Sequence, residues 1–160
     1  MEPKRLNYLT VQDIIWVNLQ VTQKVQRFRY EELEEATFYQ YGYGSRADLL
    51  AQAAKLIGGV PARAPFPEGN EATAFIALVS FLSINGRRCI LQDEEGAEWM
   101  SGSKGVSPPE IDSISVHVSE GPILERTGEH GEPDVAATMQ DALNRYPKTV
   151  ARLTLTAASA

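Results

Sequence analysis

The stretch that decides the fold is residues 64–86, which read APFPEGNEATAFIALVSFLSING. A loop with two prolines and a glycine opens onto a segment that is apolar on nearly every side, and Asn85-Gly86 then forms a stop of the usual C-terminal kind. A helix that is hydrophobic all round is buried, so we expect a helix from about residue 70 to Asn85 at the centre of its domain. Its first backbone amides have no helical partner and point into the loop, which makes a natural anion site.

Length, composition and charge limit the classes of protein to which the chain can belong. A chain of 160 residues suffices for one domain with a proper core and is too short for two of ordinary size. No apolar stretch approaches the roughly 20 residues that span a bilayer, and we expect no secretory leader and no membrane association. Cys89 is the only cysteine, which excludes an internal disulfide and fits a reducing cytoplasm. The net charge of −6 without a basic run disfavours nucleic acid as the main partner.

Two further helices are expected upstream of the central one. Thr10 and Asp13 are spaced like a capping box, and the apolar stripe behind them predicts a helix over about 11–27. That stripe consists of Val11, Ile14, Val17, Val21, Val25 and Phe28. Ser45 is placed to cap a second helix, which Gly58-Gly59 would normally end. Its expected buried face consists of Leu49, Leu50, Ala53, Ala54 and Ile57.

Between these helices, residues 37–44 alternate aromatic with small or polar side chains and end in glycines. This pattern predicts a short β-hairpin or extended flap. The candidate partner-binding residues on it are Phe38, Tyr39, Tyr41 and Tyr43. The alternative is that these rings only fill space over the core.

Downstream, the pattern is less regular. A short apolar run follows Arg87-Arg88, and residues 93–100 predict one or two helical turns. Residues 101–134 are rich in loop signals, although 111–118 fits either a short helix or a strand. Helical spacing returns over about 134–146, after which Val150, Leu153 and Leu155 are expected to pack.

The central block resembles the signature of the Fic/Doc family, whose usual form is His-Pro-Phe-x-(Asp/Glu)-Gly-Asn-(Lys/Gly)-Arg before an apolar helix. Here the matching residues are Pro65-Phe66-Pro67-Glu68-Gly69-Asn70. The resemblance extends over about residues 6–100 and includes Tyr8–Ile15 and Tyr30-Glu31-Glu32. It implies a mainly α-helical, Doc-like single domain over residues 1–160, a bundle around a central buried helix with a short β-hairpin flap.

The departures from the signature concern chemistry. Similar proteins move AMP or phosphate from a nucleoside triphosphate to a protein hydroxyl, with the motif His as base, yet Ala64 occupies that position. Loss of a general base commonly costs on the order of a hundred- to ten-thousand-fold in rate. The Lys-Arg pair is replaced by Glu71-Ala72, and like charges at about 4 Å repel by roughly 4 kcal/mol at an effective dielectric near 20.

What remains of the signature still offers binding groups. Glu68 lies where similar proteins hold a magnesium-binding acid, and Phe66, Gly69 and Asn70 complete the candidate nucleotide or anion loop. Mg²⁺ and a nucleoside triphosphate are the cofactors that the resemblance implies, but we expect the altered site to use neither. Each residue also has a plain structural reading, since Glu68 and Glu71 are favourable near a helix N-terminus and Phe66 suits the core.

Three functions remain open from the sequence. The first is a catalytically degenerate, toxin–antitoxin-related protein that binds a nucleotide-like ligand or a protein partner, such as an antitoxin-like protein. The second is an active variant transferase, and the third is a structural or oligomer-forming protein that keeps only the fold. His117 and His130 are the only histidines, and we expect them to be structural or solvated rather than replacement bases. We expect Cys89 to be a small buried hydrophobe.

Overall fold

The computed structural model describes residues 7–41, 49–101, 118–120 and 135–158, and this part of the chain is mainly helical, as expected. The helices are α1 (Val11–Thr22), α2 (Tyr30–Phe38), α3 (Leu49–Arg63), α4 (Asn70–Ile84), α5 (Asp93–Ser101), α7 (Val135–Arg145) and α8 (Pro147–Ala158). Two short strands, β1 (Arg87–Cys89) and β2 (Val118–Glu120), pair antiparallel. None of the described helices is both long and apolar enough to cross a membrane.

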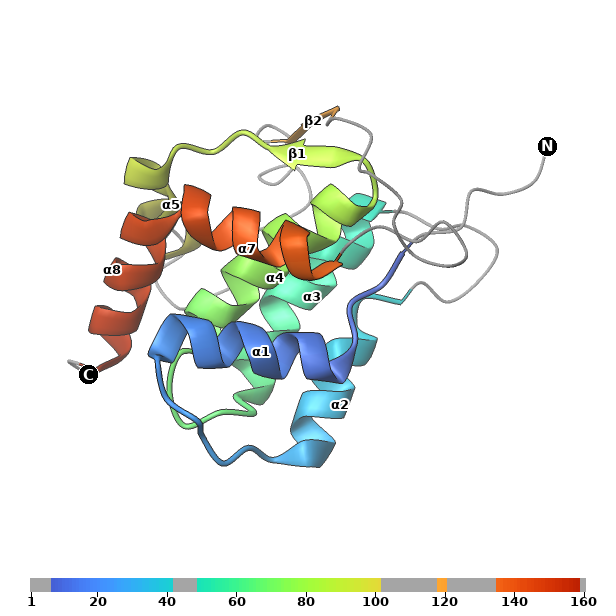
Figure 1. Cartoon of the computed structure of the whole chain (residues 1–160). Helices are drawn as coiled ribbons and strands as arrows, with labels where there is room; N and C mark the ends of the chain where they lie inside the picture. Colours follow the sequence, from blue (N-terminus) through green and yellow to red (C-terminus); the bar gives the residue numbers. More distant parts are fainter. Residues whose placement is uncertain (1–6, 42–48, 102–117, 121–134, 159–160) are drawn as a thin grey trace.

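Helix α4 is the centre of the molecule, which confirms the expectation from its all-round apolar sequence. Every residue from Ala72 to Leu82 is buried, and α1, α3, α7, α8 and β1 all pack against this helix. Figure 1 shows α4 running through the middle, behind α1 and beside α3. The stop is also where the sequence places it, because Asn85 caps the helix and Gly86 follows with a φ of 78°.

Helix α1 begins as predicted but ends five residues early. Thr10 and Asp13 form the capping box in both directions, and Leu9 before it is fully buried. The helix ends at Thr22 because Gln23 adopts a left-handed conformation, with φ 58°. The predicted helix over 11–27 is therefore too long, and Val25, expected in its buried stripe, is 91% exposed.

The predicted hairpin over residues 37–44 is wrong where the structure describes it. Residues 30–38 form α2, whose buried face consists of Leu33, Ala36 and Thr37 at helical spacing. A turn follows, and the buried Gln40 side chain bonds the main chain of Leu9 on both its N–H and its C=O. Residues 42–48, with Tyr43 and the cap predicted at Ser45, lie outside the described residues.

Helix α3 does not stop at its glycine pair. It continues through Gly58, Gly59 and Pro61 to Arg63. Gly59 serves close packing instead, because a Cβ there would lie 2.0 Å from the ring of Tyr39. The helix ends four residues later, where Ala64 takes a φ of 45°.

Helix α7 confirms the helical spacing predicted over about 134–146, and α8 follows where the sequence predicted only apolar packing. Asp93, at the start of α5, accepts hydrogen bonds from the backbone amides of Lys148 and Thr149 and so caps α8. The buried Tyr146 hydroxyl donates to the carbonyl oxygens of Leu91, at 2.7 Å, and Cys89. Cys89 itself is buried, as expected.

Candidate functional site

The signature loop joins α3 to α4 and is shaped by two residues of the motif. The Asn70 side chain brackets Phe66, donating to its carbonyl oxygen at 2.7 Å and accepting from its amide at 3.1 Å. Phe66 is buried and meets Phe28 edge to face, with 6.2 Å between ring centroids. Asn70 therefore closes the loop on itself, and Phe66 anchors it in the core.

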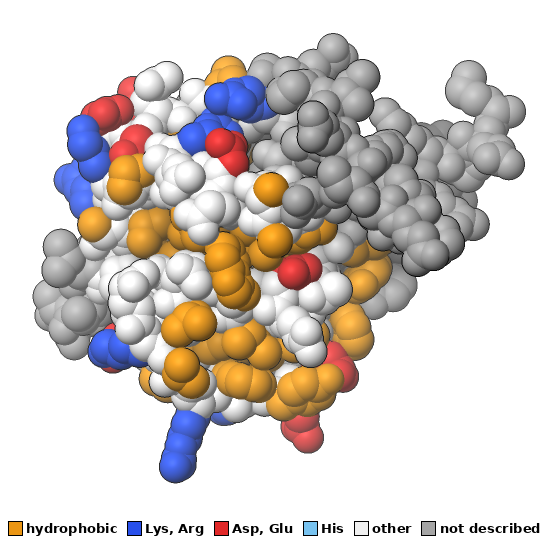
Figure 2. Space-filling model, in the orientation of Figure 1, with side chains coloured by type: hydrophobic (Ala, Val, Ile, Leu, Met, Phe, Trp, Pro, Cys, Tyr) orange, Lys and Arg blue, Asp and Glu red, His pale blue; other side chains and the backbone are white. Residues whose placement is uncertain are grey.

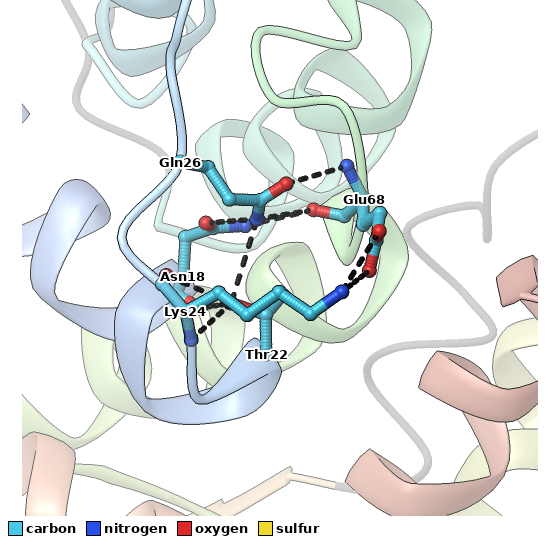
Figure 3. A network of polar contacts seen from close by, with 5 residues as sticks. All are labelled: Asn18, Thr22, Lys24, Gln26 and Glu68. Atoms are coloured by element: carbon cyan, nitrogen blue, oxygen red, sulfur yellow. Dashed lines mark hydrogen bonds and ion pairs between the residues drawn. The ribbon is translucent and has the colours of Figure 1, made fainter.

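Glu68 is engaged by main chain and side chain alike. Gln26 accepts from its amide at 3.0 Å and donates to its carbonyl oxygen at 3.1 Å. Asn18 donates to the same carbonyl at 3.0 Å. Both carboxylate oxygens of Glu68 lie 3.1 Å from the ammonium of Lys24 (Figure 3). The loop is thus clasped by residues that come from the end of α1 and the segment after it.

This network continues inward from the surface. The Asn18 side-chain amide also donates to the hydroxyl of Thr73 in α4. The side-chain oxygen Oδ1 of Asn18 accepts a hydrogen bond from the Gln26 side chain at 2.7 Å. The Thr22 hydroxyl bonds the main chain of Asn18 and Lys24. Asn18 and Thr22 are both buried, so these bonds satisfy polar groups that would otherwise be costly to bury.

The beginning of the loop is held in the same way from the other side. The Arg29 amide donates to the carbonyl oxygen of Pro65 at 2.9 Å. Its guanidinium donates to the carbonyl oxygens of Arg63 and Ala64, at 2.8 and 2.9 Å. The main-chain carbonyls from residue 63 to residue 66, together with that of residue 68, are therefore all bonded within the chain.

Gly69 allows the loop to approach α1 closely. It takes a φ of 77°, and a Cβ there would lie 2.5 Å from Cγ2 of Thr22. Both facts require glycine at this position, one through backbone conformation and one through space. The glycine of the motif is thus explained by packing against the end of α1.

The carboxylate that the resemblance assigns to a magnesium ion is paired within the chain. Mg²⁺ takes oxygen ligands, usually one or two carboxylates with waters and phosphates. Here one carboxylate faces the ammonium of Lys24, which already supplies a positive charge on both oxygens. Across the described ranges, no group of three His, Cys, Asp or Glu side chains could hold a metal ion.

The positions that differ from the signature lie beside this loop. Ala64 is half-buried next to the Arg29 guanidinium and has no group that accepts a proton. Glu71 is exposed in the first turn of α4, whereas Ala72 is buried. At position 71 the chain therefore carries a negative charge where the resemblance implies a positive one. His117 and His130 lie outside the described residues.

The aromatic residues expected on a flap have different surroundings from one another. Tyr39 accepts a hydrogen bond from the Arg63 guanidinium at 2.9 Å and packs over Gly59. Tyr41 lies against Tyr8, with 4.3 Å between ring centroids. Phe38 remains 41% exposed. Two of the three described rings thus pack against the body of the protein, and Phe38 is the one that offers substantial apolar surface.

Sequence reasoning missed the residues that hold the loop. Asn18 and Thr22 lie four positions apart, and this polar pair within the otherwise apolar stripe of α1 could have signalled a polar contact on that side of the helix. The partner of Asn18 in the loop, Glu68, lies 50 positions further along the chain, so local patterns do not reveal it. The chain matches no protein-family profile, no curated protein and no solved structure.

Proposed function

We propose that this chain is a catalytically degenerate Fic/Doc-like protein, related to toxin–antitoxin systems, that acts by binding a protein partner. The observation that carries the proposal is the state of the loop over residues 64–69. The carbonyl oxygens of residues 64–66 and 68, the Glu68 amide and the Glu68 carboxylate are all bonded within the chain, chiefly by Gln26, Arg29 and Lys24. The carboxylate that the family would use for the metal ion of a triphosphate is paired with Lys24 here.

The chemistry of transfer also lacks support at this site. A hydroxyl nucleophile needs a positioned base, and Ala64 provides none. Negative charge that develops on a transferred phosphate needs positive charge nearby, whereas the α4 N-terminus carries Glu71. Among the described residues, the positive charges next to the loop are Lys24, paired with Glu68, Arg29, bound to main-chain carbonyls, and Arg63, paired with Glu32 and Glu35.

Binding, by contrast, is supported by exposed apolar side chains next to the loop. Val25 is 91% exposed and Phe28 39%, and both lie on the segment that clasps the loop. Exposed large apolar side chains that gather on one surface mark interaction sites. A protein partner, antitoxin-like in the sense of the family, is therefore the ligand that this proposal expects.

A labelling experiment tests the proposal. The protein is incubated with Mg²⁺ and ATP labelled at the α or the γ phosphate, alone and with cell lysate, and labelled protein is sought on gels. The proposal expects no label on this chain or on any lysate protein above a blank without it. Transfer that disappears in Glu68→Ala but persists in Glu95→Ala, an exposed carboxylate in α5, would replace the proposal with an active variant transferase.

A further inference from the structure

We propose that the segment between α1 and α2 is a docking surface for a protein partner. The part of the partner that binds there is an acidic peptide segment that also carries apolar side chains. The surface is the segment 23–29 together with Tyr30, the first residue of α2, and residues 23–30 are called the basic–apolar segment below. The inference rests on the proposed function, because it takes the partner to be a protein. It adds to that function the place of binding and the chemistry that is recognised.

The basic–apolar segment presents apolar side chains that the rest of the chain leaves partly or wholly uncovered. Val25 is 91% exposed, Tyr30 56% and Phe28 39%. Figure 2 shows hydrophobic side chains gathered over α1 and along the lower edge of the molecule, where this segment runs in Figure 1. A partner that covers these side chains removes apolar surface from water, which is favourable by roughly 25 cal/mol per Å².

The same segment carries a local excess of positive charge. It holds Lys24, Arg27 and Arg29 and no acidic residue, although the whole chain has a net charge of −6. Lys24 is neutralised by Glu68. Arg29 donates to carbonyl oxygens, which leave its charge in place. Arg27 is exposed, and within residues 7–41, 49–101, 118–120 and 135–158 it forms no hydrogen bond or ion pair. Two uncompensated cations therefore flank the apolar side chains.

The segment is also held in place before any partner arrives. Gln26 is bonded to Glu68 and Asn18, and the Arg29 amide is bonded to Pro65. The side chains that alternate with these anchors, Val25 and Arg27, project freely from a fixed main chain. A surface ordered in advance loses less conformational entropy on binding than a mobile loop does.

Charge complementarity decides the kind of occupant. Carboxylates of a peptide can meet Arg27 and Arg29 while its apolar side chains cover Val25 and Phe28. Glu31 and Glu32, which follow in the first turn of α2, repel carboxylates and phosphates alike and so do not choose between the two ligands. A nucleic acid fits less well because two uncompensated cations make a small footprint for a phosphate backbone.

The test measures fluorescence anisotropy with a labelled peptide, Glu-Leu-Asp-Phe-Glu-Leu-Asp-Phe, at low salt. The comparison probes are its neutral counterpart, Gln-Leu-Asn-Phe-Gln-Leu-Asn-Phe, and a single-stranded oligonucleotide of eight uridines. We expect the acidic peptide to bind about tenfold more tightly than the neutral one, because two exposed ion pairs of a few-fold each combine. Equal binding of the two peptides, or tighter binding of the oligonucleotide, would overturn the inference.

Matched variants place the site. Arg27→Glu is expected to weaken the acidic peptide about three- to tenfold, whereas Arg87→Glu on β1 leaves it unchanged. Val25→Ser is expected to weaken both peptides, with Ile90→Ser, 46% exposed elsewhere, as its control. If Arg27→Glu and Arg87→Glu weaken peptide binding equally, the peptide does not bind at the basic–apolar segment. Label transfer from ATP would contradict the proposed function without touching this result, so the two failures are distinguishable.

Discussion

Replacing Gly69 by alanine tests the contact between the signature loop and α1. Gly69 has a φ of 77°, and its missing side chain leaves room for the methyl group of Thr22. An added Cβ would lie 2.5 Å from that methyl carbon, closer than the 3.0 Å below which something must shift. Gly69→Ala is therefore expected to destabilise the protein through the backbone and through steric overlap at once.

The two contributions can be separated with a matched glycine. Gly86 has nearly the same φ, 78°, but a Cβ there meets nothing within 4 Å. Gly86→Ala should therefore report the left-handed strain alone, roughly 1–2 kcal/mol. Gly69→Ala should cost about 1–3 kcal/mol more, the usual range for overpacking a filled interior. The effect of Gly-to-Ala replacement on the unfolded chain is the same in both variants and cancels in the difference.

Urea unfolding of the two variants, followed by circular dichroism, measures this difference. Thr22→Ser removes the obstructing methyl group and keeps the hydroxyl that bonds Asn18 and Lys24. In the Thr22→Ser background, Gly69→Ala should therefore cost little more than Gly86→Ala. If Gly69→Ala is no more destabilising than Gly86→Ala in the wild-type background, the loop does not lie against α1 as described.

Three further variants probe other contacts, each by urea unfolding. Asn18→Ala should cost about 1–3 kcal/mol, because it leaves buried partners unpaired, whereas Gln12→Ala on the exposed side of the same helix should cost little. Asp93→Ala should cost about 0.5–2 kcal/mol by removing the cap of α8, with Glu95→Ala as a control that spares the cap. Burial raises the pKa of Tyr146 above that of an unfolded tyrosine. The stability that the buried, protonated hydroxyl contributes is therefore present below about pH 10 and is lost as the pH rises further. In Tyr146→Phe the free energy of unfolding should fall less steeply above about pH 10 than in the wild type.

The parts of the fold that follow from local pattern were predictable from the sequence. The all-round apolar run of α4 gave both its bounds and its central place. Thr10 and Asp13 located the start of α1, and Asn85-Gly86 the end of α4, because capping is decided by a few neighbouring residues.

The failures have two physical reasons: tertiary contacts override some local signals, and over residues 33–39 two local signals conflict. Val25 continues the helical spacing of α1, but the chain turns left-handed at Gln23 and leaves it exposed. The aromatic alternation around Tyr39 suggested a strand, whereas Leu33 and Ala36 already marked the buried face of a helix. Gly59 did not end α3, because its role is to admit the ring of Tyr39.

The candidate site was predictable in part for the same reason. The motif located the loop, Phe66, Glu68 and Asn70, since these residues are adjacent in the chain. What the loop bonds to was not predictable, because Lys24 is 44 positions away from Glu68. The functional interpretation changes with that information: the carboxylate expected to hold a metal ion forms an ion pair within the chain.

Thermal unfolding with and without Mg²⁺ and ATP tests most directly whether the hydrogen bonds and the ion pair within the chain leave the loop unable to bind a nucleotide. The account predicts the same unfolding midpoint at millimolar nucleotide as without it. A ligand at a hundred times its dissociation constant stabilises a protein by about 2.7 kcal/mol, which for this chain length corresponds to a rise of roughly 5–10 °C. A rise of that size, abolished by Glu68→Ala, would contradict the account.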